Sequence, residues 1–164
     1  MQKHTISLLV DNEPGVLSRV AGLFSGRGFN IESLCVAETM DSQVSRITLV
    51  TRGDDAVAEQ IKKQLNKLIN IVKLYDLTRI ERVEREMALV KVKAKAEHRA
   101  EILRIVDIFR CKVVDVSPTH YTIEVTGTAD KLSAILSLLK PMGIQEIART
   151  GAIALARDKK SRSK

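Results

Sequence analysis

The chain has 164 residues, 45% of them apolar, which suffices for one large or two small packed domains whose cores are mainly aliphatic, because it has no Trp, three Phe and two Tyr. Its net charge of +7 arises after residue 76, since residues 1–76 hold equal numbers of basic and acidic side chains. No apolar run approaches the roughly 20 residues that span a bilayer, and the N-terminus lacks a signal-peptide pattern, so we expect a cytoplasmic protein.

The first half of the chain alternates between strand and helix patterns. In chain order the patterns predict a strand, a helix, a two-stranded hairpin, a second helix and a last strand, over residues 4–10, 16–26, 29–37 with 44–51, 57–69, and 71–78. Two glycines, Gly26 and Gly28, end the first helix, and residues 53–55 cap the second, whose apolar stripe continues to Ile69. The order is βαββαβ.

The second half repeats this order. Its strands and helices are predicted over residues 88–94, 100–109, 112–116 with 121–126, 132–139 and 144–148. The fold class is therefore α+β, with two tandem ferredoxin-like domains, each a four-stranded antiparallel sheet with both helices on one face. We set the domain limits at residues 1–78 and 79–156. The remaining residues 157–164 hold five bases and one acid and are expected to be a disordered basic tail.

Each predicted sheet has helices on one face only, which leaves its other face or its edge strand to be covered. Dimerisation is a common solution for units of this size, and it also removes an open strand edge. We therefore expect a homodimer.

The turn between the first strand and the first helix is the strongest candidate site. Asn12 or Glu13 can cap the helix, Pro14 suits its first turn, and Gly15 permits close approach to the backbone. The amides of residues 15–17 then form a site for a carboxylate or phosphate. An ordinary capped turn without a ligand explains the same residues, and both interpretations stay open at this point.

Motifs for other chemistry are missing from the sequence. The glycine patterns of nucleotide-binding loops are missing, no nucleophile has a recognisable base partner, and the histidines and cysteines lack the spacing of metal ligands. We therefore expect neither catalysis nor a metal site in this chain. RNA binding is the alternative, given the pI of about 9.6, but residues 44–51 lack the aromatic side chains that stack bases in RNA-recognition modules.

The chain resembles the small, regulatory subunits of acetohydroxyacid (acetolactate) synthase, whose N-terminal domain is an ACT domain. The resemblance starts with residues 11–20, DNEPGVLSRV, and covers essentially the whole chain; it is carried further by residues 22–24, 27–34, 63–68, 83–86 and 108–110. The resemblance implies that the first domain is an ACT domain that senses an amino acid, and that two ACT domains pair into a continuous sheet.

The resemblance also implies a valine site at the interface of two ACT domains. By matching position, its residues would be Asn12, Gly15, Val16 and Leu17 of one chain, completed by Asn30 and Ile31 of the partner chain. The sequence does not distinguish valine from leucine or isoleucine as the effector. The second domain has only residues 96–99 in place of the Pro-Gly turn, so we expect it to bind no amino acid there and to serve assembly or contact with the large subunit.

The partner implied by the resemblance is the catalytic large subunit of this transferase. That subunit would carry thiamine diphosphate, Mg²⁺ and FAD, whereas no cofactor is expected in this chain. The small subunit would activate the enzyme and make it sensitive to feedback inhibition in branched-chain amino acid biosynthesis. The alternative is an ACT-like sensor or RNA-binding protein that acts on another partner.

Overall fold

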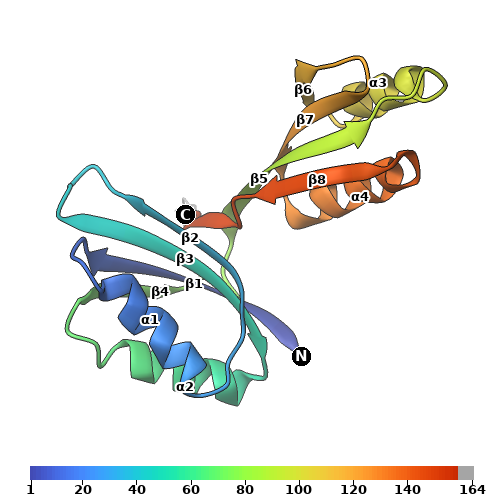
Figure 1. The fold of residues 1–164 in the computed structure, drawn as a ribbon. Coiled ribbons are helices and arrows are strands. Elements are labelled where there is room, and N and C mark those ends of the chain that lie inside the picture. Colours follow the sequence, from blue (N-terminus) through green and yellow to red (C-terminus); the bar gives the residue numbers. More distant parts are fainter. Residues whose placement is uncertain (159–164) are drawn as a thin grey trace, which may run out of the picture. The chain divides into compact units, whose positions relative to one another are not determined.

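The computed structural model describes residues 1–158. The chain forms two compact units: the first comprises residues 1–83 and 152–158, and the second comprises residues 84–151. Each has the predicted α+β architecture, with the element order βαββαβ and an antiparallel sheet (Figure 1). Within the described residues, no helix has the length and apolarity needed to span a bilayer.

The first unit is a four-stranded sheet with two helices on one face (Figure 1). Its elements are β1 (Gln2–Asp11), α1 (Val16–Ser25), β2 (Ile31–Glu38), β3 (Val44–Gly53), α2 (Asp55–Leu65) and β4 (Ile71–Asp76). The strand order is β2-β3-β1-β4, so β2 and β4 are the edges of this sheet. We call the face away from α1 and α2 the open face.

Alternating residues of the central strands build the core of the first unit. Ile6, Leu8 and Val10 of β1 point to the helices because side chains alternate between the faces of a strand, and all three are buried. The apolar stripes of the helices cover them; Val16, Val20, Leu23, Phe24, Ile61 and Leu65 belong to this cluster. The expectation that α2 continues to Ile69 was wrong, because the helix ends at Leu65 and Ile69 is 96% exposed.

Short-range polar contacts begin and end these helices. Asp54 caps α2 as predicted, with its side chain accepting a hydrogen bond from the Val57 amide at 2.8 Å. Gly28, with φ 69°, is the left-handed residue after α1, and the Phe29 amide then bonds to the Phe24 carbonyl at 2.9 Å. The second glycine therefore turns the chain from α1 toward β2.

The second unit repeats the arrangement. Its elements are β5 (Arg82–Lys93), α3 (Arg99–Ile108), β6 (Lys112–Val116), β7 (His120–Gly127), α4 (Ala129–Leu139), the 3₁₀ turn η1 (Lys140–Met142) and β8 (Ile144–Arg149). The strand order β6-β7-β5-β8 matches that of the first unit. β5 starts earlier than predicted, so it includes part of the charged segment that separates the two repeats.

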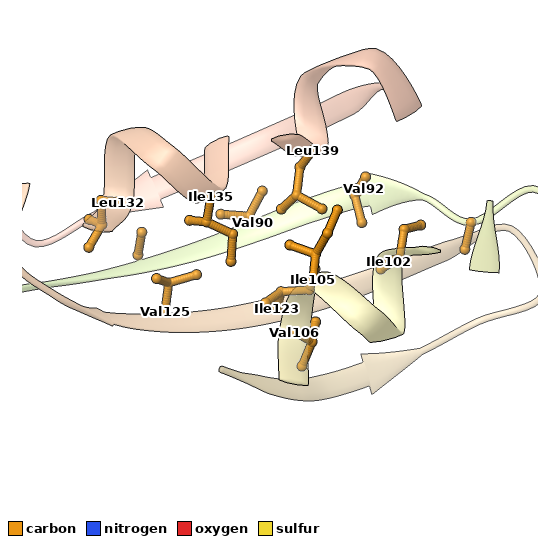
Figure 2. Packing of buried hydrophobic residues seen from close by; sticks show 12 residues of the cluster. Val90, Val92, Ile102, Ile105, Val106, Ile123, Val125, Leu132, Ile135 and Leu139 are labelled. Atoms are coloured by element: carbon orange, nitrogen blue, oxygen red, sulfur yellow. The ribbon is translucent and has the colours of Figure 1, made fainter. Parts of the chain in front are cut away.

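The core of the second unit lies between its helices and its sheet, as Figure 2 shows. The inward-facing residues of β5 and β7 meet the apolar stripes of α3 and α4; the labelled members are Val90, Val92, Ile102, Ile105, Val106, Ile123, Val125, Leu132, Ile135 and Leu139. All ten are at most 5% exposed. The cluster is aliphatic, as the composition predicts.

Truncating one of these residues should measure how much its packing contributes to the stability of the fold. Leu132→Ala removes a fully buried side chain of α4, so we expect the free energy of unfolding to fall by about 2 to 5 kcal/mol. Leu138→Ala on the same helix is the control. Because Leu138 is 49% exposed, this substitution should lower the free energy of unfolding much less. Urea denaturation followed by circular dichroism gives both values, and equal losses would contradict this placement of the core.

The end of the described chain contains a strand that the sequence analysis did not predict. β9 (Ile153–Ala156) pairs with β5, and Ala154 is buried. The first compact unit therefore includes residues 79–83 and 152–158, whereas the domain limits predicted from the sequence are 1–78 and 79–156. The reason is non-local: four residues carry little pattern of their own, and their pairing depends on a strand that lies far away in the sequence.

Two hydrogen bonds from backbone amides hold this returning segment within the first unit. The Ala152 amide donates to Ser33 Oγ of β2 at 3.0 Å, and the Arg157 amide donates to the Glu81 carbonyl at 2.9 Å. Of the predicted basic tail 157–164, residues 159–164 lie outside the described residues.

Candidate functional site

The turn between β1 and α1 is built around a left-handed glycine. Gly15 is the N-cap of α1 with φ 86° and ψ −10°, and no side chain caps the helix. The expectation that Asn12 or Glu13 caps it was wrong, and Pro14 precedes the cap instead of lying in the first helical turn. A Cβ added at Gly15 would meet no atom within 4 Å, so the backbone angle requires glycine here and the surrounding space is open.

The first turn of α1 contains backbone donors that no side chain caps. The Val16 amide makes only a long 3.4 Å bond to the Glu13 carbonyl, and the first intrahelical bond runs from the Arg19 amide to the Gly15 carbonyl at 3.0 Å. The Leu17 amide follows the Val16 amide in the first turn of α1, and the amides of a first turn have no acceptor within the helix. No acidic side chain stands in this first turn, so the positive end of the helix dipole is not neutralised there. The arrangement suits a carboxylate.

Asn12 is fixed by the hairpin between β2 and β3. Its amide nitrogen donates to the Gln43 carbonyl at 2.8 Å, and its side-chain Nδ2 donates to the Ser42 carbonyl at 2.9 Å. Within residues 1–158 its side-chain oxygen receives no hydrogen bond, and the residue is exposed. Asn12 therefore offers an oriented acceptor beside the amides of α1, which an ammonium group can use.

A hydrogen-bond network centred on Asn70 supports this turn and was not predicted from the sequence. Asn70 donates from Nδ2 to Asp11 Oδ2 at 3.2 Å, accepts the Asp11 amide on its carbonyl at 2.9 Å, and receives a hydrogen bond from the Arg19 guanidinium. These bonds connect the end of β1, the first half of α1 and the loop before β4. No local pattern reveals them, because Asn70 and Asp11 are 59 residues apart in sequence.

Asn30 and Ile31 lie at the opposite end of the same sheet. Ile31 pairs with Thr51, which pairs with His4, and the Thr51 hydroxyl donates to the Asn30 carbonyl at 2.7 Å. Asn12 instead follows the other end of β1, where Asp11 pairs with Val44. The distance along β1 from His4 to Asp11 is roughly 23 Å at ~3.3 Å per residue. One chain therefore does not bring the two groups of predicted ligand residues together.

The end of the sheet near Ile31 also contains an ion pair that the sequence analysis did not identify. Glu32 accepts a 2.6 Å hydrogen bond from Arg52 Nε and has Lys3 Nζ at 3.6 Å. The hydrogen bond from Arg52, together with Lys3, holds the pKa of the Glu32 carboxyl below its usual value, so it is ionised at neutral pH. This end of β2 thus carries a compensated charge next to Asn30.

The corresponding loop of the second unit has a different structure. His98, the N-cap of α3, has helical backbone angles instead of a left-handed turn. The Arg99 guanidinium donates to the carbonyls of Ala94 and Pro118 at 3.0 and 2.8 Å. Whether this loop binds any amino acid stays a prediction; its geometry does not repeat the Gly15 turn.

Two family profiles match adjoining parts of the chain. The profile described as the AHAS small subunit-like ACT domain matches residues 6–73, and the profile described as the small subunit of acetolactate synthase matches residues 85–158. Together they cover both units.

Similar proteins match over nearly the full length. A probable acetolactate synthase small subunit from Archaeoglobus fulgidus is 53% identical over 96% of this chain and 99% of its own length. An acetolactate synthase small subunit from Aquifex aeolicus is 54% identical over 96% of this chain and 83% of its own. The crystal structure of the acetolactate synthase small subunit from Thermotoga maritima superposes with a TM-score of 0.89 at 45% identity, covering 97% of this chain and 99% of that one.

Proposed function

Because this chain belongs to the acetolactate synthase small subunits, regulatory subunits with an ACT domain, we propose that its first unit binds valine and passes that signal to the catalytic large subunit. The observation that carries the proposal is the left-handed Gly15 turn, where no side chain caps the amides at the start of α1 and a Cβ at Gly15 would meet no atom within 4 Å. In this proposal the amides at Gly15, Val16 and Leu17 receive the ligand carboxylate and Asn12 receives its ammonium group.

A second copy of the chain completes the site in this proposal. β2 is an edge strand with 40% of Val36 exposed, so it can pair with β2 of a partner. An antiparallel pairing about a two-fold axis places the start of each β2 beside the end of the other. The end of β2 leads into the hairpin that holds Asn12, so the partner's Asn30 and Ile31 would face the Gly15 turn. This explains why residues at opposite ends of one sheet can form one site.

Regulation then follows from linkage between valine and the catalytic subunit. In this proposal, valine binds more tightly to the arrangement of the small-subunit dimer that disfavours the active enzyme. Valine therefore inhibits the enzyme, and a coupling free energy of ~1 to 3 kcal/mol is sufficient. Without valine the small subunit activates its partner. Thiamine diphosphate, Mg²⁺ and FAD belong to the catalytic subunit in this scheme, which assigns no cofactor to this chain. We expect the assembly in the cytoplasm.

RNA binding has less support in the structure. RNA-recognition modules stack bases on aromatic residues in the central strands of the open face. The central strands here are β1 and β3, and alternation along them places ten residues on the open face: Lys3, Thr5, Ser7, Leu9, Asp11, Val44, Arg46, Thr48, Val50 and Arg52. None of these is aromatic.

Titration calorimetry tests the proposed sensing directly. The purified full chain is titrated with valine, leucine, isoleucine and a short single-stranded RNA at physiological salt. Saturable heat from valine, together with valine-dependent loss of acetolactate synthesis after mixing with the catalytic subunit, is the expected result. RNA binding without any amino-acid heat would reject the sensor and make the Gly15 turn an ordinary helix start.

The contribution of the partner chain is tested at Asn30. We expect Asn30→Ala to weaken valine binding about 5- to 150-fold, equivalent to ~1 to 3 kcal/mol, because a buried ligand group would lose its hydrogen-bond partner. Ser25→Ala is a suitable control, since Ser25 is exposed at the end of α1 in the same unit. Unchanged calorimetric affinity in the Asn30 variant would remove this residue from the site.

A further inference from the structure

The open face of the first unit carries a cluster of two cations around one tyrosine. The register places Arg46, Leu9 and Lys73 in one row across β3, β1 and β4. The next row contains Thr48, Ser7 and Tyr75. The neighbouring residues Ile6 and Leu8 belong to the core on the helix side, so both rows face the opposite side. We call Arg46, Lys73 and Tyr75 the basic patch.

The side chains of the basic patch are held in place by contacts with one another and with the sheet. Arg46 Nη1 donates to Ser7 Oγ at 2.7 Å, and Arg46 Cζ lies 5.6 Å from the centre of the Tyr75 ring. Lys73 Nζ lies 4.9 Å from the same centre. Arg46 and Tyr75 are half-buried. The two positive charges are therefore positioned before any partner arrives.

No acid compensates these charges in the described part of the chain. Neither Arg46 nor Lys73 forms an ion pair within residues 1–158. The acids nearest along β1 and β4 have other partners, since Asp11 accepts a hydrogen bond from Asn70 Nδ2 at 3.2 Å and Asp76 pairs with Lys62 at 2.8 Å. A half-buried guanidinium without a counter-ion is a favourable place for a carboxylate, which its planar donors can bind in two-point fashion.

The shape of the patch favours a macromolecular partner over a small ligand. Ser7 and Thr48, which form its floor, are 0% and 1% exposed, so small side chains close the surface beneath the cations. Arginine and tyrosine together are also typical of residues that dominate protein interfaces. The other end of the open face is in contact with the chain's own returning segment through Ala152 and Ser33.

We propose that the basic patch is a docking surface for a carboxylate-bearing segment of the catalytic large subunit. The proposal rests on the proposed function for the identity of the partner. It commits to an acidic protein segment because the two cations fixed beside Tyr75 have no ion-pair partner in the described residues and are complementary to carboxylates on a polypeptide.

Charge reversal tests the docking surface with a matched control. The patch variant is Arg46→Glu with Lys73→Glu, and the control variant is Lys63→Glu with Lys67→Glu, two exposed lysines in and just after α2 with the same change in net charge. Binding of each full chain to the catalytic subunit encoded by the same genome is measured by surface plasmon resonance at low and physiological salt. We expect the patch variant to lose at least about tenfold in affinity and the control to stay within about twofold at physiological salt.

Further measurements separate the outcomes. Equal losses in both variants would show general electrostatic attraction and overturn the proposal, as would full affinity in the patch variant. Loss of single-stranded RNA binding with unchanged subunit binding would instead assign the patch to RNA. Calorimetry with valine separates a failure of the docking surface from a failure of the proposed function. Normal valine binding together with normal subunit binding by the patch variant rejects only the docking surface. A wild-type chain that binds neither valine nor the subunit rejects the proposed function and the docking surface with it.

The neutral variant Arg46→Gln with Lys73→Gln controls for misfolding of the charge-reversed variant. It removes the charges without introducing repulsion, and circular dichroism compares its folding with that of the wild type. We expect it to bind the catalytic subunit with an affinity between those of the wild type and the charge-reversed chain. A folded neutral variant with wild-type affinity would overturn the proposal independently of the charge-reversed one.

Discussion

Replacing Gly15 with aspartate is expected to abolish inhibition by valine while the activation of the catalytic subunit survives. The new carboxylate would lie at the N-terminus of α1, where it would compete for the same amides and repel the carboxylate of the ligand. We expect valine affinity to fall at least ~100-fold, equivalent to about 2.7 kcal/mol. Calorimetry with the isolated small subunit and an inhibition assay with the reconstituted enzyme measure the two effects separately.

Backbone strain needs its own control in this experiment. Any side chain at φ 86° costs roughly 1 to 2 kcal/mol, although the open space around Gly15 accepts a Cβ. Gly15→Asn has nearly the same size as the aspartate variant, is neutral, and is among the residues that best tolerate a left-handed conformation. It should therefore retain much more valine affinity. Equal affinities of the two variants would show that charge is not the cause, and inhibition of the aspartate variant at wild-type valine concentrations would exclude Gly15 from the site.

Placing an aspartate at Val36 is expected to separate the proposed dimer. Val36 lies on the edge strand β2 and is 40% exposed in the single chain, so a β2 to β2 interface would bury it. An unpaired charge buried there costs ~3 to 5 kcal/mol, which corresponds to more than a 100-fold weaker dimer. Sedimentation velocity over a range of concentrations measures this change. Valine binding should be lost in parallel, because Asn30 and Ile31 come from the partner in the proposed site.

The matched control lies on the opposite edge of the same sheet. Val72→Asp introduces the same charge on β4, where Val72 is 58% exposed. If β2 forms the interface, this variant should dimerise and bind valine as the wild type does. Dissociation caused by Val72→Asp but not by Val36→Asp would assign the interface to β4, and the explanation for the distance between Asn30 and the Gly15 turn would then be wrong.

Element order and the position of the turn before α1 were predictable because they depend on local patterns. Alternation along β1 and β5 and apolar stripes along α1 and α4 repeat within a few residues, so the sequence shows them directly. The Pro-Gly pair similarly identified the turn before α1. Its detailed structure was not predictable, since the left-handed Gly15 replaced the side-chain cap that Asn12 or Glu13 was expected to provide.

By itself, the sequence determined two βαββαβ repeats and an exposed turn at Gly15, because hydrophobic period and turn chemistry act over short separations. Only the tertiary structure determined that Asn70 braces that turn, that β9 returns to the first unit, and that Arg46 and Lys73 meet at Tyr75. Each of these contacts joins segments that are distant in sequence. Strand register and chain return, which no local pattern encodes, bring them together.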